Sequence, residues 1–346
     1  MPKRADNLMG TIASMENLEL ALYNASLGKK CKRAIAKVKA NKKELLTALQ
    51  KSLLDGTYQT SPYHHKKVFD PKEREISILP FYPDRIAQHA IINVIEPIVV
   101  SKLIPQTYAC IKGRGIHAGV RALHRALSAY REDTIYCLKM DVRHYYPSVD
   151  HDIMKAKIRR MIKDPRLLKV LDNIIDSEDG LPIGNYSSQY FANIYLNDFD
   201  HWCKEVLRIK HYFRYVDDIV ILSDSKEYLH LVFSKIKAYL CEELRLEVKD
   251  NWAIFPIDDR GIDFLGYVFR HNYTRLRKRT KIRIKRKLDA NLKDGLDAKQ
   301  IHRKMGSYQG WINYCNGRHF IQTLNDKANG KVFQQGSSRP RRKMGR

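Results

Sequence analysis

The chain has 346 residues, and its 63 Lys and Arg against 38 Asp and Glu give a formal net charge of +25. This length suffices for a buried core and about two or three subdomains, and no apolar run is long enough to span a bilayer. The N-terminal segment lacks the continuous apolar stretch of a signal peptide, and the six cysteines are scattered without a metal-binding spacing. We therefore expect a cytoplasmic protein with reduced cysteines. Its charge favours nucleic acid as a partner over a merely solvated basic surface or a membrane-surface role.

The N-terminal half is predicted to be mainly helical. Apolar residues recur at helical spacing over residues 16–26, 42–56 and 83–104. The run TIYCLKMDV at 134–142 is rich in β-forming residues and predicts a strand that ends near an aspartate. A further helix is expected after Asp150, which suits an N-cap.

The second half alternates helices and hairpins. Residues 187–207 and 227–245 have the apolar spacing of long helices. Between them, HYFRYVDDIVILSD (211–224) predicts two strands joined by a turn, and GIDFLGYVFRH (261–271) predicts a hairpin. This mixture indicates an α+β domain in the middle of the chain.

The basic residues are concentrated in three segments. The first is KKCKRAIAKVKANKK at 29–43, and the second is RLRKRTKIRIKRK at 275–287, where nine of 13 residues are basic. The third is the tail SSRPRRKMGR, whose Ser, Pro and Gly content predicts disorder. A charged run is often only a solvated face, so these segments alone do not establish a binding surface.

Three aspartates occur where strands are predicted to end. Asp141 closes one apolar strand, and Asp217 with Asp218 lies at the turn between two others. If these strands are neighbours, the three carboxylates converge, and their repulsion in a partly buried site requires cations. Hard divalent ions such as Mg²⁺ prefer oxygen ligands, and a pair of them can promote in-line displacement at a phosphate. The alternative for the two adjacent aspartates alone is a solvated β-turn.

YVDD between two apolar strands resembles the signature of reverse transcriptases, and further motifs extend the resemblance over roughly residues 1–315 in the expected order. The other similar segments are DPKEREISILPFYPDRIAQHAI and QTYACIKGRGIHAGV in the fingers, KMDVRHYYPSVDHDIM in the palm, GLPIGNYSSQYFANIYLND at the template, and GIDFLGYVF at the primer grip.

The resemblance implies a right-hand polymerase with fingers, an RRM-like antiparallel palm sheet covered by helices, and a helical thumb. The implied division is fingers with an N-terminal helical extension at 1–132, palm at 133–272, thumb at 273–335, and a basic disordered tail at 336–346. The implied activity is RNA-directed DNA polymerisation.

The segment GLPIGNYSSQYFANIYLND is similar to that of one particular group of reverse transcriptases. Many relatives carry Gln before its Gly, whereas this chain has Ile183, followed by Gln189 after the serines. This form, the compact length and the N-terminal KRADNL are similar to reverse transcriptases of diversity-generating retroelements. Those enzymes copy a template RNA with errors opposite adenine and work with a basic accessory variability protein, here expected as an oligomer.

The resemblance assigns a role to each catalytic position. Asp141, Asp217 and Asp218 are the expected catalytic residues, and with the carbonyl of Val142 they are the expected ligands of two Mg²⁺ ions, for which Mn²⁺ can substitute. The expected deoxynucleotide-binding residues are Lys72, Arg74, Tyr146, Ile183, Gly184 and Gln189.

Several of these positions keep an alternative. Tyr146 is expected to be the steric gate that excludes a ribose 2′-OH, or else a core tyrosine. Lys72 and Arg74 hold the triphosphate or form a solvated pair; Arg85 assists them or forms a structural salt bridge. Ile183 loosens the fit around the pairing base or packs a helix. Gly184 is expected to let the backbone approach the template, with Ser188 and Gln189 on the side facing nucleic acid.

The C-terminal part carries the remaining roles. Lys249 is a candidate proton donor to pyrophosphate, although Trp252 is an alternative occupant of that position. The expected primer grip is Phe264, Leu265 and Gly266, with a core hairpin as the alternative for the phenylalanine. Trp311 and Tyr308 are expected to pack helices, with stacking platforms for bases as the alternative. The expected nucleic-acid-binding cations of the thumb are Arg277, Lys278, Arg279, Lys281 and Arg283.

Two other functions remain open from the sequence. A reverse transcriptase of antiviral defence, abortive infection or another prokaryotic retroelement shares the YVDD and IGxxxSQ forms. A non-catalytic RNA-binding relative of a polymerase is the alternative outside the enzyme class, although such a protein has no chemical need for all three aspartates. Tyr146 disfavours an RNA-copying RNA polymerase.

Overall fold

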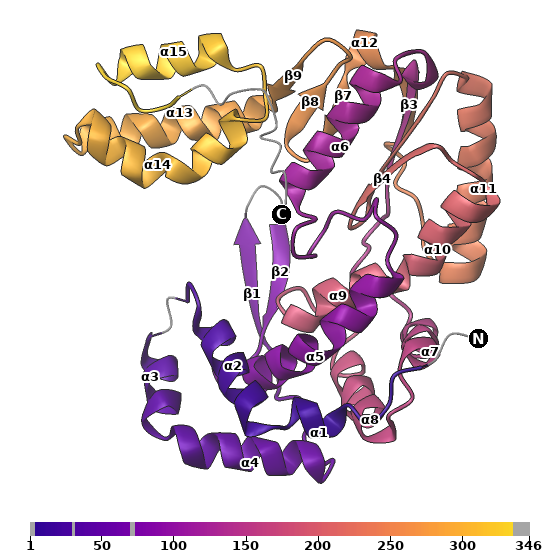
Figure 1. Ribbon diagram of the computed structural model, residues 1–346, viewed down its shortest axis with the longest axis vertical. Coiled ribbons are helices and arrows are strands. Elements are labelled where there is room, and N and C mark those ends of the chain that lie inside the picture. Colours follow the sequence, from indigo (N-terminus) through magenta and orange to yellow (C-terminus); the bar gives the residue numbers. More distant parts are fainter. Residues whose placement is uncertain (1–3, 30–31, 70–72, 335–346) are drawn as a thin grey trace, which may run out of the picture. The chain divides into compact units, whose positions relative to one another are not determined.

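The computed structural model describes residues 4–29, 32–69 and 73–334 (Figure 1). The chain forms two compact units, each assembled from three stretches. The first unit comprises Met1–Ile111, Val142–Arg208 and Lys235–Lys249, and the second comprises Lys112–Asp141, Ile209–Ser234 and Asp250–Arg346. The boundaries expected for fingers, palm and thumb remain predictions, and the basic tail lies outside the described residues.

The first unit begins with a group of helices, of which the first two pack against one long helix. These are α1 (Met9–Ile12), α2 (Met15–Ser26), α3 (Lys32–Ala40), α4 (Lys42–Leu54) and the long α5 (Ile86–Lys102). α2 packs against α5 and α4 through the buried Leu18, Ala21 and Leu22, as the helical apolar spacing predicts. The amide of the buried Asn17 adds a hydrogen bond of 2.9 Å to the carbonyl of Ala90 in α5.

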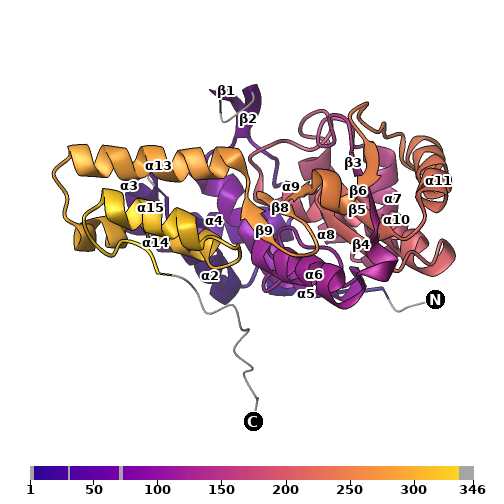
Figure 2. The same ribbon diagram turned by 90° about the horizontal axis from the view of Figure 1, so that it is seen from above.

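A two-stranded hairpin of this unit stands out from its helices (Figure 2). It pairs β1 (His64–Phe69) with β2 (Glu73–Ile78) in antiparallel register. Most side chains of the two strands are exposed, and of the residues described there only Ser77 is buried. The chain then passes through the helical turn η1 (Phe81–Arg85) into α5.

Further helices complete the unit: α7 (His151–Met161), α8 (Pro165–Ile175), α9 (Tyr186–Tyr195), α10 (Asn197–His201) and the π-helical turn η3 (Trp202–Val206). The prediction of a helix after an Asp150 N-cap is confirmed, since the Asp150 carboxylate accepts a hydrogen bond from Ile153 N. The single helix expected over 187–207 is corrected to three helical segments. α9 lies beside α5 (Figure 1) and is buried on almost all sides.

The second unit contains a four-stranded antiparallel sheet. Its strand order is β4 (His211–Tyr215), β5 (Asp218–Ser223), β3 (Tyr136–Asp141) and β6 (Ala253–Pro256). Residues 219–222 of β5 are all buried, so both faces of this strand are covered. Helix α6 (Ile116–Ala129) packs on β4, after which the short turn η2 (Glu132–Thr134) leads into β3. α11 (Lys226–Leu244) follows β5 and continues into the first unit.

The C-terminal part of this unit joins a small sheet to three helices. After α12 (Ile257–Arg260), the strands β7 (Ile262–Phe264), β8 (Tyr267–Phe269) and β9 (Thr274–Leu276) form an antiparallel sheet. The helices are α13 (Lys278–Lys293), α14 (Ala298–Ile312) and α15 (Arg318–Lys327), and α13 and α14 lie side by side (Figures 1 and 2). The predicted hairpin and basic helical region are confirmed, as is the α+β class. Among the described residues, no helix has the length and apolarity that crossing a bilayer requires.

One buried carboxylate joins the start of the chain to α8. Asp164 Oδ2 accepts hydrogen bonds from Leu8 N at 2.7 Å and Met9 N at 2.9 Å. Asp164 Oδ1 accepts from Arg166 N at 3.0 Å and Leu167 N at 3.2 Å. Burial of this carboxyl opposes its ionisation, but the four amides outweigh that effect and lower its pKa. A single side chain therefore caps two helix starts.

We expect Asp164→Ala to lower the free energy of unfolding by about 2 to 3 kcal/mol, because both caps are lost. Asp150→Ala, which removes the cap of one helix, α7, and an ion pair with the exposed Arg245, should cost about 1 kcal/mol. Since the folded pKa of Asp164 is lowered, its contribution is complete above the ordinary aspartate pKa of about 4 and is lost as the pH falls through the folded value. Urea denaturation of wild type and both variants across this range measures the difference. Equal costs for the two substitutions would contradict the double-cap interpretation.

Candidate active site

Two of the three predicted catalytic carboxylates lie directly opposite one another. Asp141 is the last residue of β3, and its register partner in the antiparallel β5 is Asp218, the first residue of that strand. Asp217 precedes it in the two-residue turn between β4 and β5, whose flanking pair is Tyr215 and Asp218. Asp141 and Asp218, 77 positions apart in sequence, thus meet at one end of the sheet.

The turn that carries Asp217 has a strained backbone. Val216 has a φ of 57°, a left-handed conformation that is unfavourable for a β-branched side chain. A positive φ at the first turn residue is typical of the type II′ turns that join twisted strands closely. Arg214 is fully buried, and its Nη1 donates to the carbonyl of Val216 at 2.8 Å. The sheet and this buried guanidinium therefore hold the turn in place.

Positive side chains offset the charge of the paired carboxylates. Lys139 lies two residues before Asp141, on the same face of β3, and forms an ion pair with Asp218. Its ammonium also lies 5.6 Å from the ring centre of the buried Phe264. Burial raises the pKa of Asp218, and the charge of Asp141 raises it further, while Lys139 and Arg277 oppose the shift. The carboxylates are therefore an electrostatically coupled pair.

The donor atoms suit a hard cation. In the parts of the chain that the structure describes, no three or more His, Cys, Asp or Glu side chains are grouped closely enough to hold a metal ion. The described residues therefore show two of the three expected carboxylates as a pair, Asp141 and Asp218, and Asp217 is next to Asp218 in the sequence. Carboxylate oxygens at a partly buried position are the ligands that Mg²⁺ prefers, so the residues fit such an ion. Val142, the expected carbonyl ligand, is fully buried and forms an isolated bridge with Val248.

The predicted nucleotide-binding residues lie in the first unit. Arg74 is exposed on β2, whereas Lys72 lies outside the described residues. Tyr146 is half-buried, with its ring edge-on to Tyr145 at 5.8 Å. The carbonyl of Tyr146 accepts from Leu181 N at 2.8 Å, so the loop at 180–184 packs on this segment. The role of Tyr146 as a steric gate remains a prediction.

Gly184 is required by a contact within the protein. The carbonyl of Ile183 accepts from Ser77 N of β2 at 2.8 Å. Gly184 has a φ of 133°, and a Cβ added there would lie 2.4 Å from the carbonyl oxygen of Ser77. The close approach to template expected from the sequence is therefore accompanied by a close approach to β2. Ser188 is buried, which corrects the expectation that it faces nucleic acid, while Gln189 is exposed.

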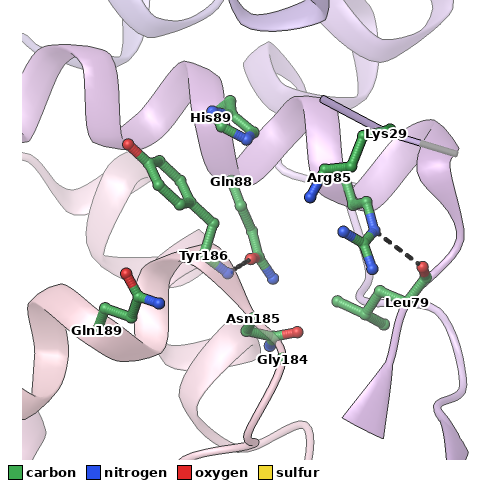
Figure 3. A pocket seen from close by; sticks show the side chains of 9 residues that line it. All are labelled: Lys29, Leu79, Arg85, Gln88, His89, Gly184, Asn185, Tyr186 and Gln189. Carbon is green, nitrogen blue, oxygen red and sulfur yellow. Dashed lines mark hydrogen bonds between the residues drawn. The ribbon is translucent and has the colours of Figure 1, made fainter. Parts of the chain in front are cut away.

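A cavity of about 160 Å³ lies at the start of α9 (Figure 3). The buried Gln88 of α5 accepts a hydrogen bond from Tyr186 N at 2.9 Å through Oε1, and the ring of His89 stacks on Tyr186 at 4.0 Å. Burial lowers the pKa of His89 to about 4, with help from Lys29 and Arg85, so this imidazole is neutral at pH 7. The cavity is lined by Lys29, Leu79, Arg85, Gln88, His89, Gly184, Asn185, Tyr186 and Gln189.

Sequence reasoning missed Gln88 and His89. The available signal is a pair of adjacent polar residues inside the mainly apolar helical run IAQHAIINVI. Arg85, expected either to assist the triphosphate-binding residues or to form a salt bridge, lines this cavity and donates from Nε to the carbonyl of Leu79 at 3.4 Å.

The expected primer grip is a tight hairpin with buried side chains. Phe264 and Leu265 are 0% and 7% exposed, so both side chains are buried, and the primer-grip role of this segment remains a prediction. Leu265 and Gly266 have φ values of 53° and 85°, as in the type I′ turn of a two-residue hairpin loop. The backbone of this turn is the part left available for contact, and the core-hairpin alternative holds for Phe264.

The predicted nucleic-acid-binding cations lie at and just before the start of α13. Lys278, Arg279 and Arg283 are exposed at the start of α13. Arg277 pairs with Asp263, and the Lys281 ammonium lies 5.9 Å from the ring of Phe320. Both are half-buried.

Trp252 is not an available proton donor. Its ring stacks on Phe233 of α11 at 3.8 Å, which makes it a packing residue. Lys249 is half-buried, and its role remains a prediction.

Comparison with known proteins agrees with this geometry. Protein YkfC of Escherichia coli (strain K12) is 26% identical over 270 residues, which cover 64% of this chain and 70% of that protein. The group II intron-encoded protein LtrA of Lactococcus lactis subsp. cremoris is 19% identical over 302 residues, which cover 66% of this chain and 50% of that protein. The chain thus spans only half the length of the second relative.

Solved telomerase structures are more distant. Apo telomerase from Candida tropicalis, truncated from its C-terminal domain, has a TM-score of 0.46 at 13% identity, covering 61% of this chain and 54% of that chain. Telomerase from Candida albicans, in complex with a TWJ fragment of telomeric RNA, has a TM-score of 0.47 at 12% identity, covering 80% and 57%. This similarity is too low to indicate anything more about the chain.

The family of reverse transcriptases (RNA-dependent DNA polymerases) has a model that matches residues 64–269, from β1 to the end of β8. This match confirms the resemblance at the level of the family, the right-hand polymerase class and the enzyme class of RNA-directed DNA polymerases. Because the match covers more than half of the chain, the protein belongs to the reverse transcriptase family.

Proposed function

We propose that this chain extends a primer along an RNA template by transferring deoxynucleotides, with the chemistry at the shared end of β3 and β5. The observation that carries the proposal is the opposition of Asp141 and Asp218 on neighbouring strands, with Asp217 in the strained turn beside them. A solvated β-turn does not account for a carboxyl that lies partly buried opposite a second carboxyl, and whose pKa is raised by desolvation and further by that neighbour. Nucleotidyl transfer does account for it, because that reaction uses divalent cations held by carboxylates.

The carboxylates of Asp141, Asp217 and Asp218, with the carbonyl of Val142, would hold two Mg²⁺ ions. When bound, these ions promote attack by the primer 3′-hydroxyl and stabilise the leaving pyrophosphate. Asp141 and Asp218 orient the donor oxygens through the rigid sheet register. Lys139 reduces the repulsion between these two carboxylates through its ion pair with Asp218.

Other residues have supporting roles in this proposal. Arg74 and Lys72 bind the triphosphate, for which the planar Arg fork is well suited. The exposed cations at the start of α13 follow the backbone of the template–primer duplex, which makes binding sensitive to salt. Lys249 would donate a proton to pyrophosphate, and a lower kcat for primer extension in Lys249→Met would test that role.

The first test removes charge from the central turn. Asp217→Asn and Asp218→Asn should each lower RNA-templated primer extension by about 1,000-fold or more, because transition-state charge is no longer stabilised through these carboxylates. Asp224→Asn, at the opposite end of β5, is the matched control and should retain activity. Extension of a labelled DNA primer on an RNA template measures the effect. Full activity in the Asp217 or Asp218 variant would overturn the proposed mechanism.

A second test concerns sugar selection. Tyr146→Ala should allow ribonucleotide incorporation at a rate at least about tenfold higher than wild type, because the ring that would collide with a 2′-OH is absent. Tyr145→Phe, at the buried neighbour, should leave selection unchanged. Single-nucleotide extension with matched ribo- and deoxynucleotides gives the ratio. An unchanged ratio in Tyr146→Ala would assign this residue to the core.

We further propose that the enzyme serves a diversity-generating retroelement, making error-prone cDNA from a template-repeat RNA with a basic accessory protein. The support is the sequence resemblance: Ile183 in place of the common Gln, Gln189 after the serines, and the compact chain. The Ile183 carbonyl is fixed to β2 by Ser77, so a change of side chain here need not move the loop.

Fidelity is the property that tests this proposal. Ile183→Gln should lower misincorporation opposite template adenine severalfold, because a polar side chain restores contacts that discriminate against mispairs. Ile183→Val, which keeps the apolar character, is the control. Sequencing of cDNA made by purified enzyme with its neighbouring RNA and accessory protein measures the error spectrum. Accurate copying of adenine by the wild-type enzyme would count against this subtype and favour a defence role.

A further inference from the structure

The turn between β7 and β8 is covered by an aromatic ring from α14. A Cβ added to Gly266 would lie 2.6 Å from Cζ3 and 3.1 Å from Cη2 of Trp311. The indole thus occupies the space beside the turn in which any other residue would place its side chain. Gly266 is needed at this position both for its φ of 85° and for the contact with Trp311.

Two neighbouring residues strengthen this contact. The ring of Tyr267 stacks on Trp311 with a centroid distance of 5.5 Å and an interplanar angle of 22°. The Tyr267 hydroxyl donates to the carbonyl of Trp311 at 2.9 Å. On the other side of the turn, the carbonyl of Gly266 accepts from Arg277 N at 2.9 Å. The turn is therefore held between α14 and the start of α13.

The end of α14 is itself fixed to other elements of the same unit. Asn316 accepts from Thr274 N at 2.8 Å through Oδ1 and donates from its own N to Thr274 O at 2.7 Å, which ties it to β9. Tyr314 stacks on His117 of α6 at 4.4 Å, and Arg121 donates to its hydroxyl at 3.0 Å. Trp311 thus lies in a segment anchored to β9 and to α6.

Trp311 also faces a cleft of about 450 Å³ that lies next to the catalytic turn. Tyr215, two residues before Asp217, lines this cleft together with His117 and Arg121. Gly113 and Gly115 contribute backbone with open space around them. The volume is within the range of small-ligand sites. A guanidinium for phosphate, rings for stacking and glycines for close backbone approach suit one nucleotide unit of a strand.

We propose that Trp311 is a positioning residue for the primer strand. It keeps the β7–β8 turn in one place and forms a wall of the cleft through which the last primer nucleotides pass Tyr215. This inference rests on the proposed polymerase function, because only a primer-extending enzyme needs a strand beside the YVDD turn. Trp311, expected from sequence to pack a helix, packs the hairpin and lines the cleft at once.

The test compares Trp311→Ala with Trp311→Phe and with Trp252→Ala. Trp252 is a matched control, because it is a tryptophan of the same unit that stacks on Phe233 and lines neither the cleft nor the turn. Trp311→Ala should raise the KM for primer–template about tenfold, the scale expected for loss of an aromatic stack and its adjoining contacts. Its kcat at saturating primer–template should change by less than about twofold, since the carboxylates are intact. Trp311→Phe should recover most of the KM, and Trp252→Ala should lower Tm without changing KM.

Equilibrium binding separates this inference from the proposed function. Fluorescence anisotropy with a labelled RNA–DNA hybrid should show about tenfold weaker binding by Trp311→Ala, with binding of the single-stranded template RNA unchanged. A wild-type protein that binds the hybrid but never extends it would contradict the polymerase proposal, while the binding comparison would still test Trp311. Unchanged hybrid affinity in Trp311→Ala, or an equal loss in Trp252→Ala, would reduce Trp311 to a packing residue. If Trp311→Ala does not fold, Tyr267→Phe, which removes the hydroxyl that donates to the Trp311 carbonyl, provides the same comparison at a smaller amplitude.

Discussion

The repulsion between two carboxylates on adjacent strands is the constraint around which the second unit is built. Asp141 and Asp218 are register partners, and burial together with their mutual charge raises the pKa of Asp218. A folded chain tolerates such a pair only when positive charge is supplied nearby. Lys139 and Arg277 supply part of it, and divalent cations held by the same oxygens would supply more. The charges that destabilise this end of the sheet are thus the ones that would suit it to bind divalent cations.

The backbone next to the carboxylate pair is strained at Val216, and the surrounding structure holds it in that conformation. Val216 holds a left-handed conformation because β4 and β5 are paired up to the turn and the buried Arg214 binds its carbonyl. The β7–β8 turn also has residues with positive φ values, Leu265 and Gly266, and Trp311 packs against it at Gly266. In each hairpin one side chain outside the turn holds the turn in place: Arg214 of β4 in the first, and Trp311 of α14 in the second. Residues at these turns can therefore be positioned to within the tolerance that nucleotidyl transfer requires.

The sequence predicted those parts of the fold whose burial follows a simple pattern. The apolar run Ile219–Leu222 interrupted by two aspartates identified β5 and its turn, because buried strands read as continuous apolar segments. The hairpin of β1 and β2 was not predicted, since its side chains are largely exposed and carry no alternating apolar signal. Phe264 was placed at the primer because the family motif contains it, whereas the structure buries it under Lys139. The reason for Gly184, its contact with the Ser77 carbonyl, depends on a partner over 100 residues away and has no local signal.

The distribution of charge connects these local features to the excess of cations in the chain. Outside the carboxylate pair, the exposed cations of α13 and the Arg121 beside the cleft present positive charge within the same unit. A polyanionic strand drawn to these cations brings its own phosphates toward two aspartates, an approach that is repulsive unless divalent ions are bound there. Binding of nucleic acid and binding of metal at this site should consequently be cooperative, because each reduces the electrostatic cost of the other. The proposed function thus gives the +25 net charge and the acidic pair complementary roles: the cations would attract the strand, and the carboxylates would make its productive approach depend on bound metal.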